Sequence, residues 1–292
     1  MRLKAFREGE AVLFTLPALV PLLVFWFGPL GYIVYLSFTE WDFMSPEKLF
    51  VGLENYTYLL THADFYQALK VTLLFGFGTV IPIIVGGLAL ALLMNSKLRS
   101  TGLFRAMMFS PWVTPTVAVS IAWSWIFEPD VGLANLVLGW IGVSPVGWLQ
   151  DSTWALVAVM IVTVWKSIGW SMVFYLVALR NLPQDLMEAA AIDGANAWDK
   201  FRGITLPLIS PTTLFLSIIL TIQSLQAYDQ INVMTQGGPA GSTRTLLYMY
   251  YQSAFESFNV GEASAIAVII ILICVLLSGL SFLLSRRLVH YS

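Results

Sequence analysis

Charged residues are scarce in this 292-residue chain, at 11% of the sequence. Soluble domains carry about 25%, so the chain has too few charges to cover a water-soluble globule of its size. It has a single cysteine, Cys274, which excludes an internal disulfide and a cysteine-based metal site. The net charge of −2 offers no attraction for nucleic acid, and 58% hydrophobic residues argue against disorder. The composition therefore indicates an integral membrane protein.

Catalytic motifs are also missing from the sequence. No Walker A pattern is present, because the only lysine followed by Ser or Thr is Lys166, and no glycine-rich loop precedes it. The two histidines, His62 and His290, are far apart and near no acidic cluster. No pair of carboxylates lies in an apolar stretch, where a proton relay would need one. We therefore expect a protein that is not an enzyme and has no catalytic residue, no metal site and no bound cofactor.

Six long stretches contain no charged residue apart from Lys166, and each is long enough to cross a bilayer as a helix of about 20 residues. The expected spans are residues 11–38, 71–96, 106–127, 153–179, 205–228 and 263–285. Residues 131–150 are also uncharged, but their repeated glycines favour an interfacial or re-entrant segment. The sequence thus predicts an all-α integral membrane protein with six transmembrane helices in one domain, residues 1–292.

The first stretch is expected to be a retained span rather than a signal peptide. It is longer than the apolar core of a signal peptide, shows no small-residue cleavage site and contains Pro17, Pro21 and Pro29. In the second span, glycines are expected at positions of close helix packing. These glycines are Gly76, Gly78, Gly86 and Gly87.

Basic residues are distributed unevenly among the loops. With the N-terminus inside, the external segments hold only Lys48 and Arg244. The cytoplasmic segments hold Arg2, Lys4, Arg7, Lys97, Arg99, Arg105, Arg180, Lys200, Arg202, Arg286 and Arg287. Because cytoplasmic loops are richer in Lys and Arg, we expect a multi-pass protein of the cytoplasmic membrane with both termini in the cytoplasm.

The cytoplasmic segment 180–204 has the pattern of two short helices joined by a tight turn. Pro183 suits a first helical turn, and Gly194 can end that helix in a left-handed conformation. Asn196, with Asp199 three residues later, is typical of a second helix start. Taken alone, this pattern also fits an amphipathic connector lying on the lipid headgroups.

Particular residues in this segment resemble the EAA loop of the membrane permeases of binding-protein-dependent ABC importers. That pattern is Glu-Ala-Ala, three residues, Gly, nine residues, then Ile-x-Leu-Pro. The matching residues are Glu188, Ala189, Ala190, Gly194, Ile204, Leu206 and Pro207. The variant Ala-Ala-Ile-Asp-Gly-Ala around Asp193 resembles the carbohydrate branch, and residues 51–56 and 237–255 are similar to external elements of the family.

The resemblance implies a type I ABC importer permease fold, in which segment 180–204 is the coupling loop that docks on an ATPase subunit. It implies four kinds of neighbour: a homologous second permease, two ATPase subunits that bind ATP and Mg, an external substrate-binding protein and membrane lipid. It also implies that residues 229–261 form an external loop facing the binding protein, and that the chain binds no nucleic acid.

Two helix faces are candidates for the substrate path. Lys166 is the only charge inside a span, and an ionisable residue there indicates a functional site. The face on the fourth span consists of Thr163, Lys166, Ser167 and Trp170, at helical spacing. The face on the fifth span consists of Gln223, Ser224 and Ala227. The resemblance to the maltose branch places sugar contacts on these faces, although the side chains differ from that branch.

Alternatives remain open for both the faces and the function. The hydroxyls could bond to their own helix, the glutamines could join helices, and Lys166 could pair with an acid or extend to the membrane surface. The expected function is import of an oligosaccharide or disaccharide by alternating access, driven by ATP hydrolysis on the partner subunits. Importers of glycerol 3-phosphate or a polyol are alternatives, and a stand-alone secondary transporter is an alternative of another class.

Overall fold

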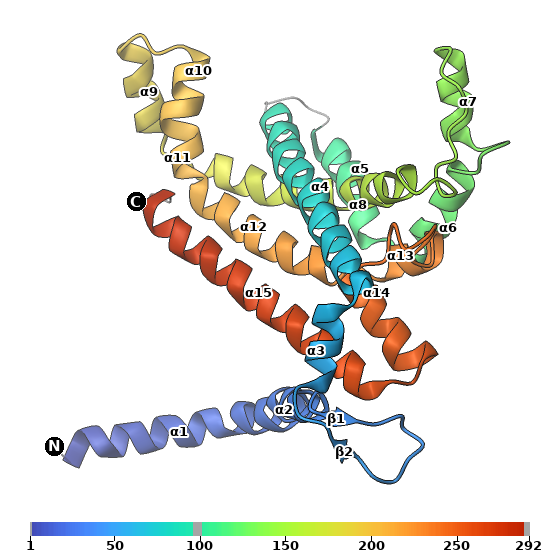
Figure 1. Ribbon diagram of the computed structural model, residues 1–292. Helices are drawn as coiled ribbons and strands as arrows, with labels where there is room; N and C mark the ends of the chain where they lie inside the picture. The colour runs from blue at the N-terminus through green and yellow to red at the C-terminus, as the bar shows by residue number, and fades with distance from the viewer. Residues whose placement is uncertain (1, 96–100, 289–292) are drawn as a thin grey trace. The chain divides into compact units, whose positions relative to one another are not determined.

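The computed structural model describes residues 2–95 and 101–288, which are mostly helical (Figure 1). Lys97, Arg99 and His290 lie outside the described residues. Within that part, five helical segments are long and apolar enough to cross a membrane. They are 12–36, Ala63–Met94, Trp154–Arg180, Ala197–Leu225 and Val260–Leu283. The all-α membrane fold class is confirmed, and five of the six expected spans overlap these segments.

The expected third span, 106–127, is two helices instead of one. Helix α5 (Thr101–Val113) ends one residue before Thr114-Pro115, and α6 (Thr116–Ile126) begins immediately after it. Pro115 has no N–H to donate to the preceding turn, and a residue before proline is disfavoured in the helical conformation. The break therefore has a local cause that hydropathy alone does not show.

The chain forms two compact units, of which the first comprises residues 1–62 and 249–269. Its elements up to residue 62 are α1 (Arg2–Leu22), a π-helical turn η1 (Leu23–Phe27), α2 (Gly28–Leu36), β1 (Thr39–Glu40), β2 (Leu49–Phe50) and α3 (Glu54–Thr61). β1 and β2 pair antiparallel, with Thr39 opposite Phe50. The Asn55 amide donates to the carbonyls of Ser37 and Thr39, both at 3.0 Å, which fixes α3 to the end of α2.

Residues 249–269 complete the first unit. They include η3 (Gln252–Glu256) and the beginning of α15 (Val260–Leu288). Gly261 lies so close to the carbonyl of Thr39 that a Cβ there would clash with it. The backbone N–H of Val260 also donates to the carbonyl of Trp41 at 2.9 Å. The beginning of α15 is therefore held against the β1 segment.

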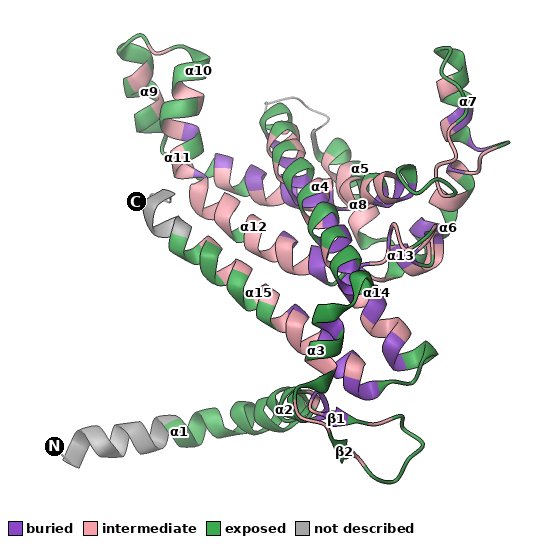
Figure 2. Ribbon diagram, viewed as in Figure 1, coloured by how far each residue is buried: buried purple, intermediate pink, exposed green. Residues whose placement is uncertain are grey.

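The second unit comprises residues 63–248 and 270–292. Its core helices are α4 (Ala63–Met94), α8 (Trp154–Arg180) and α12 (Ser210–Leu225). Where they meet, Ile83, Met172, Tyr175 and Leu216 are buried, as Figure 2 shows for these helices. The remaining elements are α5, α6, α7 (Leu133–Trp140), α9 (Gln184–Ile192), α10 (Ala197–Lys200), η2 (Phe201–Thr205), α11 (Leu206–Leu208), α13 (Asp229–Met234) and the beginning of α14 (Leu246–Tyr251).

Glycines let α4 and α8 approach closely, as expected from the sequence. A Cβ on Gly78 would lie 2.6 Å from the sulfur of Met160, and one on Gly87 would lie 2.7 Å from the Cβ of Ser171. A Cβ on Gly169 of α8 would likewise clash with the backbone of α5 at Met108, so this glycine lets α8 approach α5 closely. That third contact was not expected, because Gly169 has no glycine neighbours that would mark it as part of a packing face.

Residues 131–150 fold around one buried amide. Asn135, on α7, donates to the carbonyls of Pro129 and Val146, both at 2.9 Å. Its oxygen accepts from the Val146 N–H at 3.0 Å and the Trp148 indole N–H at 2.9 Å. With all four hydrogen-bonding positions of this amide used, the loop after α7 is tied back onto the helix.

Candidate functional site

Six of the seven side chains expected on the substrate path line one cavity of about 320 Å³ in the second unit. They are Thr163, Lys166, Ser167, Gln223, Ser224 and Ala227. The two faces are about 60 residues apart in the chain, and they meet because α8 and α12 both pack on α4. Helix α4 contributes three further lining residues, Phe75, Thr79 and Ile83.

Trp170 is the exception, because it does not line the cavity. Its ring instead stacks on Trp112, with centroids 5.2 Å apart, and contacts Phe174 at 4.7 Å. The role of Trp170 in the substrate path stays a prediction, and its side chain is not part of the lining of this cavity. Trp170 lies one helical turn beyond Lys166 on α8. At that level, α8 contacts Trp112 of α5.

Lys166 is the only charged residue that lines the cavity within the described part of the chain. Its ammonium donates to the backbone carbonyl of Trp112 at 3.0 Å and lies 5.5 Å from the centre of the Trp112 ring. The Asp229 carboxylate, at the start of α13, also attracts this ammonium electrostatically. One of its three N–H groups is used in the bond to the Trp112 carbonyl, which leaves two for a ligand.

The hydroxyls of the lining are partly committed to their own helices, as the structural alternative proposed. Thr163 donates to the carbonyl of Val159 at 2.8 Å, and Ser224 donates to that of Thr221 at 2.8 Å. A hydroxyl that donates in this way keeps acceptor lone pairs. The side-chain amide of Gln230 donates to the hydroxyl oxygen of Thr163 at 3.4 Å and so uses one of these lone pairs.

Several lining residues escaped the sequence reasoning. Gln230 was placed in an external loop, 229–261, but α13 brings it to the cavity. Trp112 and Thr116 lie on either side of the helix break and were hidden inside an expected uniform span. The one available signal was Pro115, since a proline inside an apolar stretch marks a position where a helix ends or kinks.

The coupling segment has the two helices expected from its residues. Gly194 has a φ of +81°, and the N–H groups of Ala195 and Gly194 donate to the carbonyls of Ala190 and Ala191. This is the hydrogen-bond pattern of a Schellman helix end. Asn196 and Asp199 form a reciprocal capping box that starts α10. The turn between α9 and α10 is thereby fixed by local backbone and side-chain hydrogen bonds rather than by packing.

The surface of this segment is open. Neither α9 nor α10 has a buried residue, as Figure 2 shows. Of the residues in the motif, the exposed ones are Glu188, Ala189, Asp193, Gly194 and Leu206, and the half-buried ones are Ala190, Ile204 and Pro207. Two large apolar side chains next to them are also exposed, Ile192 by 87% and Trp198 by 64%. An exposed apolar surface beside a charge is typical of a site where another protein docks.

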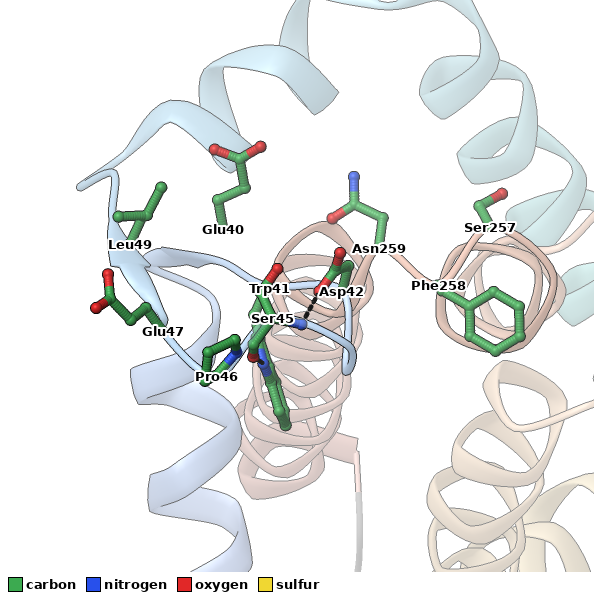
Figure 3. A pocket seen from close by; sticks show the side chains of 10 residues that line it. All are labelled: Glu40, Trp41, Asp42, Ser45, Pro46, Glu47, Leu49, Ser257, Phe258 and Asn259. Carbon is green, nitrogen blue, oxygen red and sulfur yellow. Dashed lines mark hydrogen bonds between the residues drawn. The ribbon is translucent and has the colours of Figure 1, made fainter.

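A separate hollow of about 550 Å³ lies in the first unit (Figure 3). Its lining includes Trp41, Phe258 and the three acids Glu40, Asp42 and Glu47. Hydrogen bonds from backbone N–H groups, chiefly that of Ser45 at 2.8 Å, hold the pKa of the Asp42 carboxyl below its ordinary value. Within the described residues no group of acids, histidines or cysteines is arranged to hold a metal ion.

Known proteins with similar sequences cover almost the whole chain. Residues 78–290 match the family described as binding-protein-dependent transport system inner membrane component. The chain is 37% identical to the trehalose/maltose transport system permease protein MalF of Thermococcus litoralis, covering 90% of each chain. It is 36% identical to the lactose transport system permease protein LacF of Rhizobium radiobacter, covering 98% of this chain and 97% of that one.

Two further similarities concern a different solute and the fold. The sn-glycerol-3-phosphate transport system permease protein UgpA of Agrobacterium fabrum is 31% identical over 96% of this chain and 95% of its own length. The fold is similar to a chain of a bacterial ABC transporter involved in the import of the acidic polysaccharide alginate, with a TM-score of 0.83. At 22% identity, with 99% and 100% of the two chains covered, that likeness shows the fold alone.

Proposed function

The chain belongs to the binding-protein-dependent transport system inner membrane component family, and from that premise we propose that its cavity carries a sugar across the cytoplasmic membrane of a prokaryote. The chain is a multi-pass permease subunit of an ABC importer, and its sequence relatives carry names of sugar and glycerol-phosphate systems. The observation that carries the choice of a sugar is the composition of the cavity.

A sugar presents apolar C–H faces and a ring of hydroxyls, so its site needs an aromatic surface together with hydrogen-bond donors and acceptors. The cavity offers Trp112 as the aromatic surface and Lys166, Gln223 and Gln230 as polar groups. Its volume of about 320 Å³ is at the low end for a small-molecule site. We therefore expect this chain to hold part of an oligosaccharide or disaccharide, with a homologous second permease completing the pocket.

Segment 180–204 is the proposed docking site for an ATPase subunit, with two such subunits in the complex. Its fixed turn at Gly194 would transmit a push from the ATPase without bending, while Glu188 offers a charge to a basic partner. ATP and Mg would be bound and used on those partners, and closure of the ATPases would switch the cavity between outward and inward access. Both termini would then lie in the cytoplasm, with an external substrate-binding protein on the other side and lipid around the spans.

The experiment that tests this function is purification of the tagged chain in mild detergent, followed by identification of its partners and an ATPase assay. We expect a second permease and an ATPase, with hydrolysis stimulated by the binding protein. Glu188→Lys and Gly194→Pro should abolish transport while the chain stays in the membrane. Glu188→Asp and Gly194→Asn are matched controls, because the first keeps the negative charge and asparagine tolerates a positive φ. Normal uptake by both disruptive variants would refute the coupling role.

An importer of glycerol 3-phosphate or a polyol is the second candidate, favoured by Lys166 and by the 31% identical relative. The Lys166 ammonium, whose hydrogen-bond partner is a neutral carbonyl, could donate to the oxygens of a phosphate. Uptake of glycerol 3-phosphate but of no disaccharide by the purified complex would decide for it. Uptake by this chain without an ATPase would instead indicate a stand-alone secondary transporter.

A further inference from the structure

Helices α8 and α12 connect the cavity to the two ends of the coupling segment. Helix α8 ends at Arg180, where segment 180–204 begins, and α12 begins at Ser210, a few residues after that segment ends (Figure 1). The same two helices carry lining side chains of the cavity, which include Lys166 on α8 and Gln223 on α12. A movement of the coupling segment therefore reaches the two substrate faces along two separate helices.

A hollow of about 410 Å³ lies between α8 and α12 near their coupling ends. Its lining includes Val177 and Asn181 of α8 and Pro211 and Thr212 of α12. Side chains do not fill this space, so the two helices are not packed on each other across it. At this level they are joined by the contacts beside the hollow.

Two hydrogen bonds join α8 to α12 on the buried side of this hollow. The hydroxyl of Tyr175, a fully buried residue, donates to Oγ1 of Thr213 at 3.0 Å. Thr213 in turn donates to the carbonyl of Ile209 at 3.3 Å, at the junction of α11 and α12. Hydrogen bonds in such a chain strengthen one another in apolar surroundings. Tyr175 is thus linked through Thr213 to the backbone two residues after Pro207 of the EAA motif.

An aromatic contact supports the same junction. The rings of Phe174 and Phe215 lie 5.4 Å apart with an interplanar angle of 36°. Phe174 precedes Tyr175 on α8, and Phe215 follows Thr213 by two residues on α12, so the polar and aromatic contacts lie at one level. We call these four residues, Phe174, Tyr175, Thr213 and Phe215, the α8–α12 clamp.

We propose that the α8–α12 clamp makes α8 and α12 move as one body, so that a displacement of the coupling segment by the ATPase carries both substrate faces together. Tyr175 is a positioning residue in this arrangement, because it does not line the cavity and acts through Thr213. This inference rests on the proposed function and deepens it, since it states how the coupling segment acts on the cavity. Access then changes between this pair of helices and its neighbours, while the distance between α8 and α12 stays constant.

The test measures sugar uptake per ATP hydrolysed by the complete transporter in liposomes, with the binding protein present and tritiated maltose, trehalose and lactose as probes. Tyr175→Phe keeps the ring and removes the hydroxyl. We expect this ratio to fall roughly fivefold, the factor that one hydrogen bond contributes. The Kd of the sugar, measured without ATP, should stay within a factor of about two. Tyr56→Phe is the matched control, because it removes a 2.7 Å bond between the Tyr56 and Ser37 hydroxyls in the first unit.

Variants of Thr213 separate the clamp from a merely structural role. Thr213→Val removes the acceptor and should lower the uptake ratio at least as far as Tyr175→Phe does, whereas Thr213→Ser keeps the hydroxyl and should leave the ratio near that of the wild type. Adding Tyr175→Phe to Thr213→Val should cause no further loss, because the bond between them is already absent. A loss of stability alone would lower uptake and ATP hydrolysis together and leave their ratio unchanged.

A distance measurement tests the clamp without transport. Cys274 is the single cysteine of the chain, so a Cys274→Ser background allows spin labels to be placed on Val177→Cys and Thr212→Cys, which line the hollow from its two helices. With the clamp intact, the distance between the labels should be the same with and without ATP. Tyr175→Phe should broaden the distribution of this distance.

Two results would overturn the clamp. They are an uptake ratio in Tyr175→Phe equal to that in Tyr56→Phe, and a distance between the labels that changes with ATP while the clamp is intact. Failure of the chain to purify with an ATPase, or of the wild-type transporter to take up any of the three sugars, would instead refute the proposed function. The two failures are therefore distinguishable.

Discussion

Replacing Gly169 with alanine should damage the transporter far more than adding one methyl group suggests. Gly169 on α8 faces the backbone of α5 at Met108, where a Cβ would lie 2.5 Å from the carbonyl carbon and closer still to the carbonyl oxygen. Both obstacles are main-chain atoms, so no side chain can rotate to make room. The contact lies one helical turn from Lys166 on α8 and one turn from Trp112 on α5.

The size of the effect follows from these distances. Carbon atoms in contact sit about 3.5 Å apart or more, so α5 and α8 must separate locally by at least about 1 Å. The same movement would stretch the 3.0 Å bond between Lys166 and the Trp112 carbonyl to about 4 Å, beyond a hydrogen bond. Overpacking of this kind costs about 1–3 kcal/mol, and the lost charged hydrogen bond adds about 1.5–3 kcal/mol.

The assay is the midpoint of thermal aggregation of the purified complex, measured together with sugar binding. Gly169→Ala should lower the midpoint by several degrees and weaken binding, because the Trp112 ring moves with α5. Gly279→Ala is the matched control, since Gly279 also lies inside a membrane helix and has nothing within 4 Å of its Cβ position. If Gly169→Ala behaves like Gly279→Ala in both measurements, the packing argument is refuted.

Three further predictions concern other parts of the molecule. Ser167→Leu combined with Gln223→Leu should reduce transport while stimulation of ATPase activity by the binding protein persists, and an unchanged transport rate would reject the lining role. Asn135→Leu should open the loop 141–150 to protease. The substitution leaves an indole N–H, a backbone N–H and two carbonyls without their partner, at a cost of several kcal/mol. Protection of the loop equal to that of the wild type would contradict this prediction. Because the pKa of Asp42 is lowered in the fold, its turn is stabilised above pH about 4 and loses that stabilisation as pH falls through the folded pKa. The protection of the Met44 and Ser45 amides against hydrogen exchange should then fall in acid, and Asp42→Ala should remove this pH dependence.

Local chemistry made the coupling segment readable from the sequence. A glycine that can take a positive φ ends α9, and Asn196 with Asp199 starts α10, each through hydrogen bonds within five residues along the chain. Hydropathy likewise gave the membrane helices, because a bilayer imposes a length on any apolar stretch that crosses it. Such features depend on neighbours in sequence and need no knowledge of the partner helices.

The two faces of the substrate path were also visible, because helical periodicity places residues three and four apart on one side of a helix. Their meeting in one cavity was not, since it depends on how α8 and α12 pack on α4. The same limit explains Trp170, which shares the periodicity of the lining but lies against Trp112. Periodicity predicts which residues share one face of a helix. The angle at which two helices cross decides which of those residues reach the cavity.

The sequence by itself determined that the chain is a helical membrane protein, that it carries the EAA loop and which two helix faces are polar. Only the tertiary structure decided that the carbonyl of Trp112 is the partner of Lys166 and that Gln230 reaches the cavity. The physical reason is the range of the interactions. Capping, hydropathy and periodicity act over a few residues, whereas Lys166 and Trp112 are 54 positions apart and meet only because Gly169 lets α5 and α8 approach closely.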